Sequence, residues 1–274
     1  MGCELLKGFR MLDLTDEKGA MCGKMFADMG AEVIKVEPPQ GCSTRRIPPF
    51  LNDQPGLNTS TYFLAYQAGK RSITLNLESA DGRRLLSDLA AHADFLAQSH
   101  PRGYLESIGL GYDALAAINP RLIYTSITPF GDRGPGRDYL AADINIWAAG
   151  GNMYLMGEPG KPPLQISLPQ AGLHAGAEAS VGSLIAHYPR QVSGQGQHVV
   201  VDMQACIVWT LMNAQAFPIL HGGSMTRNGV YAGGLRLRRK GVFRCADGHI
   251  SLMFVGGSAA PSTKAFVQWM DEKG

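Results

Sequence analysis

The chain has 274 residues, of which 45% are hydrophobic and 18% are charged, enough for a sizeable core and unlike a disordered protein. Its formal net charge of +2 gives no strong signal for nucleic acid, and no apolar run approaches the roughly 18 residues that span a bilayer. We therefore expect one large domain and part of a second, with neither nucleic acid nor membrane as a partner.

The N-terminus, the cysteines and the histidines carry no signal for export or metal binding. Residues 1–14 lack a long apolar segment followed by a cleavage site, so a cytoplasmic location is expected. The five cysteines are odd in number and far apart, and no CxxC pair occurs. This pattern predicts free thiols, and the seven scattered histidines show no metal-binding spacing.

Strands and helices alternate through the N-terminal half. A strand at 9–14, a helix at 18–29 and a strand at 32–37 form a βαβ unit, whose two strands should be parallel. Residues 40–61 are rich in Pro, Gly, Asn and Ser, which predicts a long loop of the kind that is often functional or mobile. The alternation continues with a helix at 61–67, a strand within 68–77, a helix at 81–92, a strand at 94–98, a helix at 112–118 and a strand at 121–130.

Lys70 and Arg71 lie at the entrance of the strand within 68–77, beside a flexible turn. Their spacing fits a phosphate contact and a solvated pair at a loop edge equally well. Residues 109–114 fit the pattern GxGxxA but follow a helical turn, whereas a dinucleotide-binding loop follows a strand. No dinucleotide cofactor is therefore predicted.

The C-terminal half begins with a helix at 141–151, where Asp143 suits the first turn. Ser167 and Gln170 fit a capping box, which predicts a helix from there to about Tyr188. A strand at 197–203 and a long apolar helix at 204–220 follow. We place a domain boundary here, with a large domain at 1–220 and a second, unfinished domain at 221–274 that contains a hairpin through Asp247 and Gly248 and a helix at 259–271.

Several segments carry a resemblance to a known family. They include FADMGAEVIKVEPPQG, AGKRSITLNL, ESIGLGYDALAAINPRLIYTSITPFGDRGP, AADINIWAAGG, GLHAGAEASVGSLIAHYPRQVSGQGQHVVVDMQ and CADGHISL. In this order they resemble the class III CoA-transferases, the formyl-CoA transferase or carnitine CoA-transferase family (CaiB/BaiF type). The resemblance implies a Rossmann-like α/β large domain with a parallel sheet and flanking helices, a smaller α+β second domain that is truncated here, and an interlocked dimer.

The resemblance also implies an activity and a site. Members move CoA between carboxylic acids: an Asp carboxylate attacks the thioester carbonyl, forms a mixed anhydride and frees the CoA thiolate. The matching positions suggest Lys70, Arg71 and Ser72 as contacts of the adenine part, and Ser99 and Gly103 in the segment that matches the pantetheine contact. CoA or acyl-CoA would be a substrate, and no tightly bound cofactor is expected.

The position of the family's catalytic Asp is occupied by Leu168, which cannot form an anhydride. Three hypotheses follow. In the first, the chain is the Asp-lacking subunit of a heteromeric transferase whose homologous partner carries the Asp. In the second, it uses another carboxylate, although the candidate Glu178 lies too far along the same predicted helix to replace residue 168. In the third, it is a non-catalytic CoA-binding or structural remnant. The acid that would receive CoA is not identified by the sequence.

Overall fold

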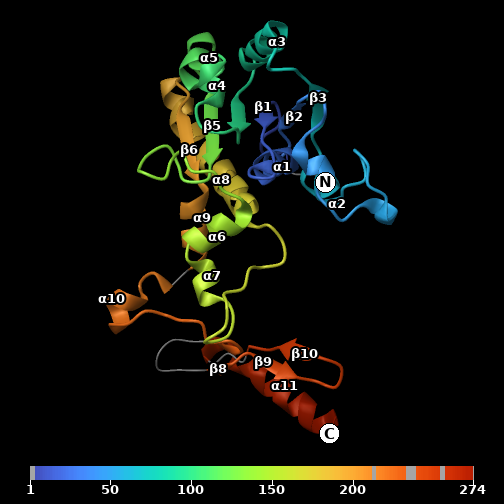
Figure 1. The fold of residues 1–274 in the computed structure, drawn as a ribbon, viewed down its shortest axis with the longest axis vertical. Coiled ribbons are helices and arrows are strands. Elements are labelled where there is room, and N and C mark those ends of the chain that lie inside the picture. The colour runs from blue at the N-terminus through green and yellow to red at the C-terminus, as the bar shows by residue number, and fades with distance from the viewer. Residues whose placement is uncertain (1–3, 212–213, 233–238, 254–256, 274) are drawn as a thin grey trace. The chain divides into compact units, whose positions relative to one another are not determined.

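The computed structural model describes residues 4–211, 214–232, 239–253 and 257–273 (Figure 1). Its internal contacts divide the chain into two compact units. The first unit comprises Met1–Asn152 and Gln165–Met212, and the second comprises Met153–Leu164 and Asn213–Gly274. The predicted boundary after residue 220 stays a prediction. No helix among the described residues is long and apolar enough to cross a bilayer.

The first unit is built on a sheet of six strands. All neighbouring strands are parallel, as predicted. The strands are β1 (Arg10–Leu14), β2 (Glu32–Glu37), β3 (Arg71–Thr74), β4 (Phe95–Gln98), β5 (Ile123–Thr128) and β6 (His198–Asp202), in the order β3-β2-β1-β4-β5-β6. In the central register, Leu12 of β1 pairs with Ile34 on one side and Leu96 on the other. The strand order reverses between β1 and β4, and α/β sheets of this type bind ligands at that switch point.

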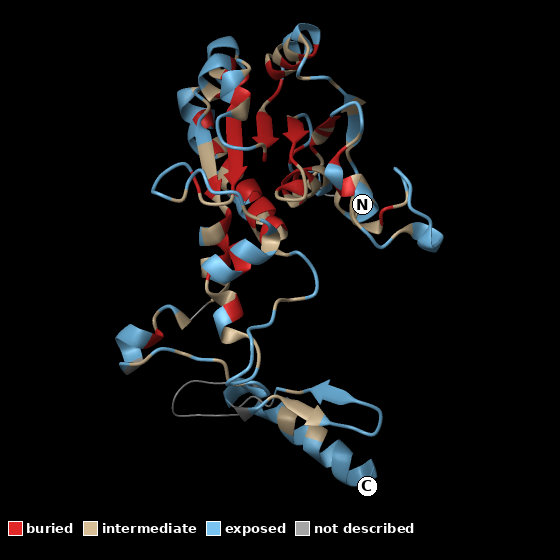
Figure 2. Cartoon of the chain, in the orientation of Figure 1, coloured by how far each residue is buried: buried red, intermediate tan, exposed pale blue. Residues whose placement is uncertain are grey.

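Helices cover both faces of this sheet. The helices of the first unit are α1 (Ala20–Asp28), α2 (Thr61–Tyr66), α3 (Ala80–Ala90), α4 (Tyr104–Ser107), α5 (Tyr112–Ile118), α6 (Asp143–Ala149), α8 (Ala171–Ser193) and α9 (Met203–Thr210). The short helix α7 (Asn152–Leu155) starts at the last residue of this part of the first unit and otherwise belongs to the second unit. Buried residues gather on the central strands and on the helices packed against them (Figure 2). Leu86, Leu105 and Leu115 of α3–α5 join Leu12 and Leu96 in one core cluster, and α1 and α8 pack against each other.

Helix α8 begins later than the sequence predicts. The predicted capping box at Ser167 and Gln170 is wrong. Helix α8 starts at Ala171, its N-cap residue is Gln170, and the Gln170 side chain accepts no capping hydrogen bond. Instead, the backbone N–H of Ala171 donates to Asp143 Oδ1 at 2.7 Å. A carboxylate at a helix N-terminus satisfies an unpaired N–H and complements the helix dipole. The cap thus comes from the first residue of α6, 28 positions away.

Small residues on α8 allow it to approach α1 and the loop before it closely. A Cβ atom added at Gly172 would lie 2.3 Å from the carbonyl oxygen of Glu17, and one added at Gly176 would lie 2.9 Å from Met21 Cβ. Real Cβ atoms do not come this near to another backbone. The start of α8 therefore fixes the chain around Glu17 and Lys18, just beyond the carboxyl end of β1.

Two further helix predictions differ from the structure. Pro189 lies inside α8, which continues to Ser193 and ends at Gly194 in the left-handed conformation (φ 71°). The predicted helix at 204–220 is divided into α9 and α10 (Phe217–His221), and α10 carries Pro218 in its first turn, where a missing N–H is tolerated.

The second unit contains short strands and the terminal helix. It includes β7 (Tyr231–Ala232), β8 (Arg239–Lys240), β9 (Val242–Arg244), β10 (His249–Ser251) and α11 (Ala260–Lys273). Antiparallel pairing of β9 with β10 confirms the predicted hairpin through Asp247 and Gly248. The buried sulfur atoms of Cys22, Cys42 and Cys206 and the exposed one of Cys245 are free thiols, and Cys3 lies outside the described residues.

Candidate functional site

A pocket opens at the carboxyl ends of the central strands. Its volume is ≈ 370 Å³, and the segments that follow β1, β2, β3 and β4 all contribute to its wall. The lining residues are Leu14, Thr15, Asp16, Val36, Glu37, Pro38, Pro39, Gln40, Cys42, Ser43, Leu75, Asn76, Leu77, Glu78, Ser99, His100, Pro101 and Tyr104. The pocket spans the switch point between β1 and β4, where doubly wound α/β proteins bind nucleotides.

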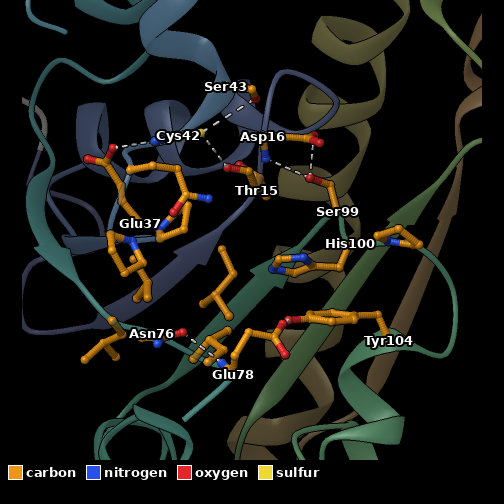
Figure 3. A pocket seen from close by; sticks show the side chains of 18 residues that line it. Thr15, Asp16, Glu37, Cys42, Ser43, Asn76, Glu78, Ser99, His100 and Tyr104 are labelled. Atoms are coloured by element: carbon orange, nitrogen blue, oxygen red, sulfur yellow. Dashed lines mark hydrogen bonds between the residues drawn. The ribbon is translucent and has the colours of Figure 1, made fainter.

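Aliphatic and polar side chains both line this pocket. Leu14, Val36, Leu75 and Leu77 supply aliphatic surface. Figure 3 shows Asp16 and Ser99 close together on one side, with the rings of His100 and Tyr104 below them. A flat heterocycle can pack on the aliphatic surface while polar groups at the margins fix its orientation.

Asp16 and Ser99 connect the ends of β1 and β4. Ser99 Oγ donates to Asp16 Oδ1 at 2.6 Å and accepts from the Asp16 backbone N–H at 2.8 Å. The backbone N–H of Lys18 donates to Asp16 Oδ1 at 2.9 Å, and the Lys18 ammonium pairs with the same carboxylate. Of the five predicted contact residues, Ser99 lies in the wall of this pocket.

His100 contributes a neutral ring to the pocket. Its ring contacts that of Tyr104 at a tilt of 33°, with the ring centroids 5.0 Å apart, and the Tyr104 hydroxyl donates to Glu78 Oε1 at 2.6 Å. Burial lowers the pKa of His100, and the cations Lys35 and Lys18 add to this effect against the opposing influence of Asp16. His100 is therefore unprotonated at neutral pH and offers no positive charge to an anion.

Behind the pocket lies a buried ion cluster made of Asp13, Lys35 and Lys70. Lys70 Nζ donates to Asp13 Oδ2 at 2.7 Å, to the Ala20 carbonyl at 2.9 Å and to Gln67 Oε1 at 2.7 Å. Lys35 Nζ lies 3.3 Å from Asp13 Oδ1 and donates to the Thr15 carbonyl. Burial alone would raise the pKa of Asp13, but the two ammonium groups outweigh it and hold that pKa well below its usual range.

This cluster uses the whole hydrogen-bonding capacity of the Lys70 ammonium group. Its side chain is only 1% exposed, and all three of its N–H protons are used within the protein. Arg71 is 80% exposed at the amino end of β3, where it pairs with Glu32 Oε1 at 3.0 Å. The pocket lies at the carboxyl ends of the strands, so neither cation faces it in this structure.

Ser72, by contrast, belongs to a network around Glu37 at the end of β2. The Glu37 carboxylate accepts from Arg45 Nε at 2.6 Å, Arg45 Nη2 at 2.7 Å, the Cys42 backbone N–H at 2.9 Å and the Ser72 hydroxyl. Burial opposes ionisation, but these donors lower the pKa of Glu37 to about 2. Arg45 also donates to the Leu57 carbonyl at 2.9 Å and lies 3.8 Å above the Phe63 ring.

The two remaining predicted positions lie outside the pocket lining. Gly103 adopts a left-handed conformation (φ 81°) immediately before α4. Leu168 is 63% exposed in the irregular segment before α8. The sequence reasoning missed Asp16, Glu78, His100 and Tyr104, although the first three could have been found because each follows a predicted strand at its carboxyl end. Among the described residues, no group of three or more His, Cys, Asp or Glu side chains could hold a metal ion.

The strand order, the covered sheet faces and the pocket at the switch point define a Rossmann-like α/β protein. Comparison with protein families takes the assignment further. The model of CoA-transferase family III matches residues 6–273, and the chain belongs to this family. The family resemblance noted in the sequence and the α/β fold it implied are thereby confirmed.

Curated relatives include transferases of several acids. The chain is 39% identical to "Succinyl-CoA:(R)-benzylsuccinate CoA-transferase subunit BbsE" of Thauera aromatica, over 97% of this chain and 64% of that protein. It is 36% identical to the "Succinate--glutarate CoA-transferase" of Agrobacterium fabrum, over 74% of this chain and 52% of that protein. The chain thus spans between about half and two thirds of the length of these relatives.

Solved structures share the fold. A CAIB/BAIF family protein from Brucella suis superposes with a TM-score of 0.80 at 33% identity, covering 89% of this chain and 64% of that one. Rv3272 from Mycobacterium tuberculosis gives a TM-score of 0.77 at 29% identity, covering 98% of this chain and 69% of that one. The parallel sheet with its flanking helices is therefore the architecture of the family.

Proposed function

We propose that this chain binds the CoA part of an acyl-CoA in the pocket at the carboxyl ends of β1–β4, and that it serves as the Asp-lacking subunit of a heteromeric class III CoA-transferase. Family membership supports the CoA thioester as the substrate class. The observation that carries the subunit role is Leu168, an exposed leucine where the family resemblance puts a nucleophilic carboxylate. A relative whose name designates it a transferase subunit supports the heteromer.

The pocket suits the nucleoside end of CoA. Its aliphatic surface can pack against adenine, while Glu78 and Asn76 offer acceptors for the amino group or ribose hydroxyls. Cations stand near the rim: Arg46 Nη2 donates to the Gln40 carbonyl at 2.7 Å, and Arg83 Nη1 donates to the Glu78 carbonyl at 2.9 Å. In this proposal these two guanidinium groups meet the phosphates of CoA.

The chemistry of the transfer requires a carboxylate from elsewhere. The family mechanism joins a carboxylate oxygen to the thioester carbonyl and releases the CoA thiolate, and an alkyl side chain at 168 supplies neither electrons nor charge. Asp143 already accepts the N–H of Ala171, and exposed Glu178 lies seven residues into α8, roughly 10 Å along its axis. We therefore assign the nucleophile to a homologous partner that carries Asp at the matching position.

Purified alone, the chain is expected to bind CoA in a calorimetric titration and to show no acyl exchange between succinyl-CoA and a panel of carboxylic acids. Exchange should appear when an Asp-bearing homologue is co-expressed, or in the variant Leu168→Asp. Turnover by the unmodified chain alone would contradict the subunit role, and failure to bind CoA both alone and with the partner would contradict the site.

A charge change at the pocket rim provides a second test. Gln40→Glu adds a carboxylate beside the proposed phosphate position and is expected to raise the Kd for CoA about fivefold at low ionic strength, because like charges repel across a few ångströms. Gln54→Glu is the matched control, since Gln54 is exposed but does not line this pocket. Equal CoA affinities of the two variants would show that the phosphates bind elsewhere.

A further inference from the structure

The buried ion cluster of Asp13, Lys35 and Lys70 contains two ammonium groups for one carboxylate. Both lysines pair with Asp13, whose side chain is fully buried. The side chains of Lys35 and Lys70 are only 2% and 1% exposed, so water screens neither charge effectively. If both lysines are protonated, the cluster holds one positive charge in excess.

Both lysines are held in the charged form. Burial alone would lower the pKa of Lys35, but Asp13, the largest opposing influence, helps to raise it above its usual value. Burial lowers the pKa of Lys70, and Lys35 adds to this effect against the influence of Asp13. The Nζ of Lys70 nevertheless has three acceptors at 2.7–2.9 Å, on Asp13, Ala20 and Gln67. Only an ammonium group can donate to all three, so the excess charge is present.

The excess charge lies directly behind the wall of the first pocket. Lys35 donates to the Thr15 carbonyl, and Cys42 Sγ lies 3.8 Å from the same oxygen (Figure 3). Thr15 and Cys42 line the pocket, whereas Lys35 does not. The charge is felt inside the pocket: after burial itself, Lys35 is among the influences that lower the pKa of the lining residue His100.

The lining of the pocket is acidic, and one of its carboxylates is not balanced by a cation. The charged lining residues are Asp16, Glu37 and Glu78. Lys18 pairs with the first of them and Arg45 with the second. Within the described part of the chain, no lysine or arginine side chain pairs with Glu78. A positive charge behind the wall therefore offsets a negative charge that would otherwise repel an anionic ligand.

We propose that Lys35 strengthens the binding of the CoA phosphates electrostatically, from behind the pocket wall and without touching the ligand. This inference rests on the CoA site proposed above and adds a residue to it. A fixed charge buried among protein atoms acts over several ångströms, because little water screens it. Loss of Lys35 would leave Asp13 and Lys70 as a balanced pair, so its effect on binding can be separated from its effect on folding.

Lys35→Met removes the excess charge and keeps a long side chain. We expect the variant to unfold at a urea concentration close to that of the unmodified chain, because the remaining ion pair is balanced. In calorimetric titrations at low ionic strength it should bind CoA about tenfold more weakly, but dephospho-CoA, which lacks the 3′-phosphate, only about threefold more weakly. High salt should narrow both differences. A lysine with a purely structural role would affect the two ligands equally.

Lys24→Met is the matched control, because it removes a lysine charge from α1 at a position that does not line the pocket. It should bind both ligands as the unmodified chain does. Lys35→Gln keeps an N–H donor for the Thr15 carbonyl and should repeat the binding loss of Lys35→Met.

Four outcomes would overturn the inference. They are equal CoA affinities of Lys35→Met and the unmodified chain, equal losses for CoA and dephospho-CoA, equal losses in Lys35→Met and Lys24→Met, and failure of both Lys35 variants to fold. A different result would contradict the proposed function itself. If the unmodified chain binds no CoA, the proposed CoA site fails, and this inference fails with it.

Discussion

Replacing Asp13 by Asn should lower the free energy of unfolding by about 3–5 kcal/mol, the range measured when one partner of a buried ion pair is removed. Asp13 is fully buried and is the carboxylate that both Lys35 and Lys70 contact. The amide preserves the shape of the side chain but leaves two ammonium groups without their counter-charge. Urea titration at pH 7 followed by circular dichroism measures the change.

The pH dependence follows from the lowered pKa of Asp13. Its folded value lies well below the reference value of 3.8, so the stabilisation is fully present above about pH 5 and is lost only as the pH falls through the folded value. The control is Asp28→Asn, which removes the surface pair with Lys24 and should cost less than about 1 kcal/mol. Similar losses in the two variants would mean that Asp13 does not hold the cluster together.

Gly172→Ala should destabilise the first unit by about 3 kcal/mol, at the upper end of the range for overpacked sites. The added methyl group would lie 2.3 Å from the Glu17 carbonyl oxygen and 2.9 Å from Lys18 Cα, and these are backbone atoms that no rotamer change can move away. Either α8 or the chain after β1 must shift. Since Asp16 and Lys18 lie on that segment, we also expect weaker CoA binding.

Gly182→Ala on the same helix is the matched control. There the nearest atom to the new methyl group is Val199 Cγ1 at 3.0 Å, which a small side-chain movement relieves. Alanine is favoured over glycine in a helix by roughly 1 kcal/mol, so this variant should lie close to the unmodified chain. Thermal unfolding of both variants separates the two effects, and a Gly172→Ala variant that is as stable as Gly182→Ala would refute the close approach.

Local patterns predicted the elements of the first unit well. The apolar runs that became β1, β2, β4 and β5 alternate with helical segments, and this alternation was sufficient to predict a parallel sheet. The Asp-Gly pair predicted the hairpin of β9 and β10 for a similarly local reason. These features depend on residues close together in the chain.

Other features depend on partners far along the chain, which a single sequence does not reveal. The cap of α8 is Asp143 and not a neighbouring side chain, so the local capping box was misleading. The ammonium of Lys70 can be buried because it pairs with the Asp13 carboxylate. Asp13 lies 57 positions earlier in the chain, so the sequence around Lys70 does not reveal this pair. Arg71 stays a predicted contact; its place at the amino end of β3, the edge opposite to the one where such sheets bind ligands, follows from the strand prediction alone.

Arg45 pairs with the Glu37 carboxylate at the end of β2, donates to the Leu57 carbonyl in the long segment between β2 and α2, and lies over the Phe63 ring of α2. One wall of the first pocket is therefore preorganised. Ordering a long side chain on association costs about 0.5–1.5 kcal/mol, and here that loss of freedom occurs when the chain folds. This wall is already ordered before a ligand binds. The affinity of the ligand therefore depends on its contacts and on desolvation, and not on the ordering of this segment.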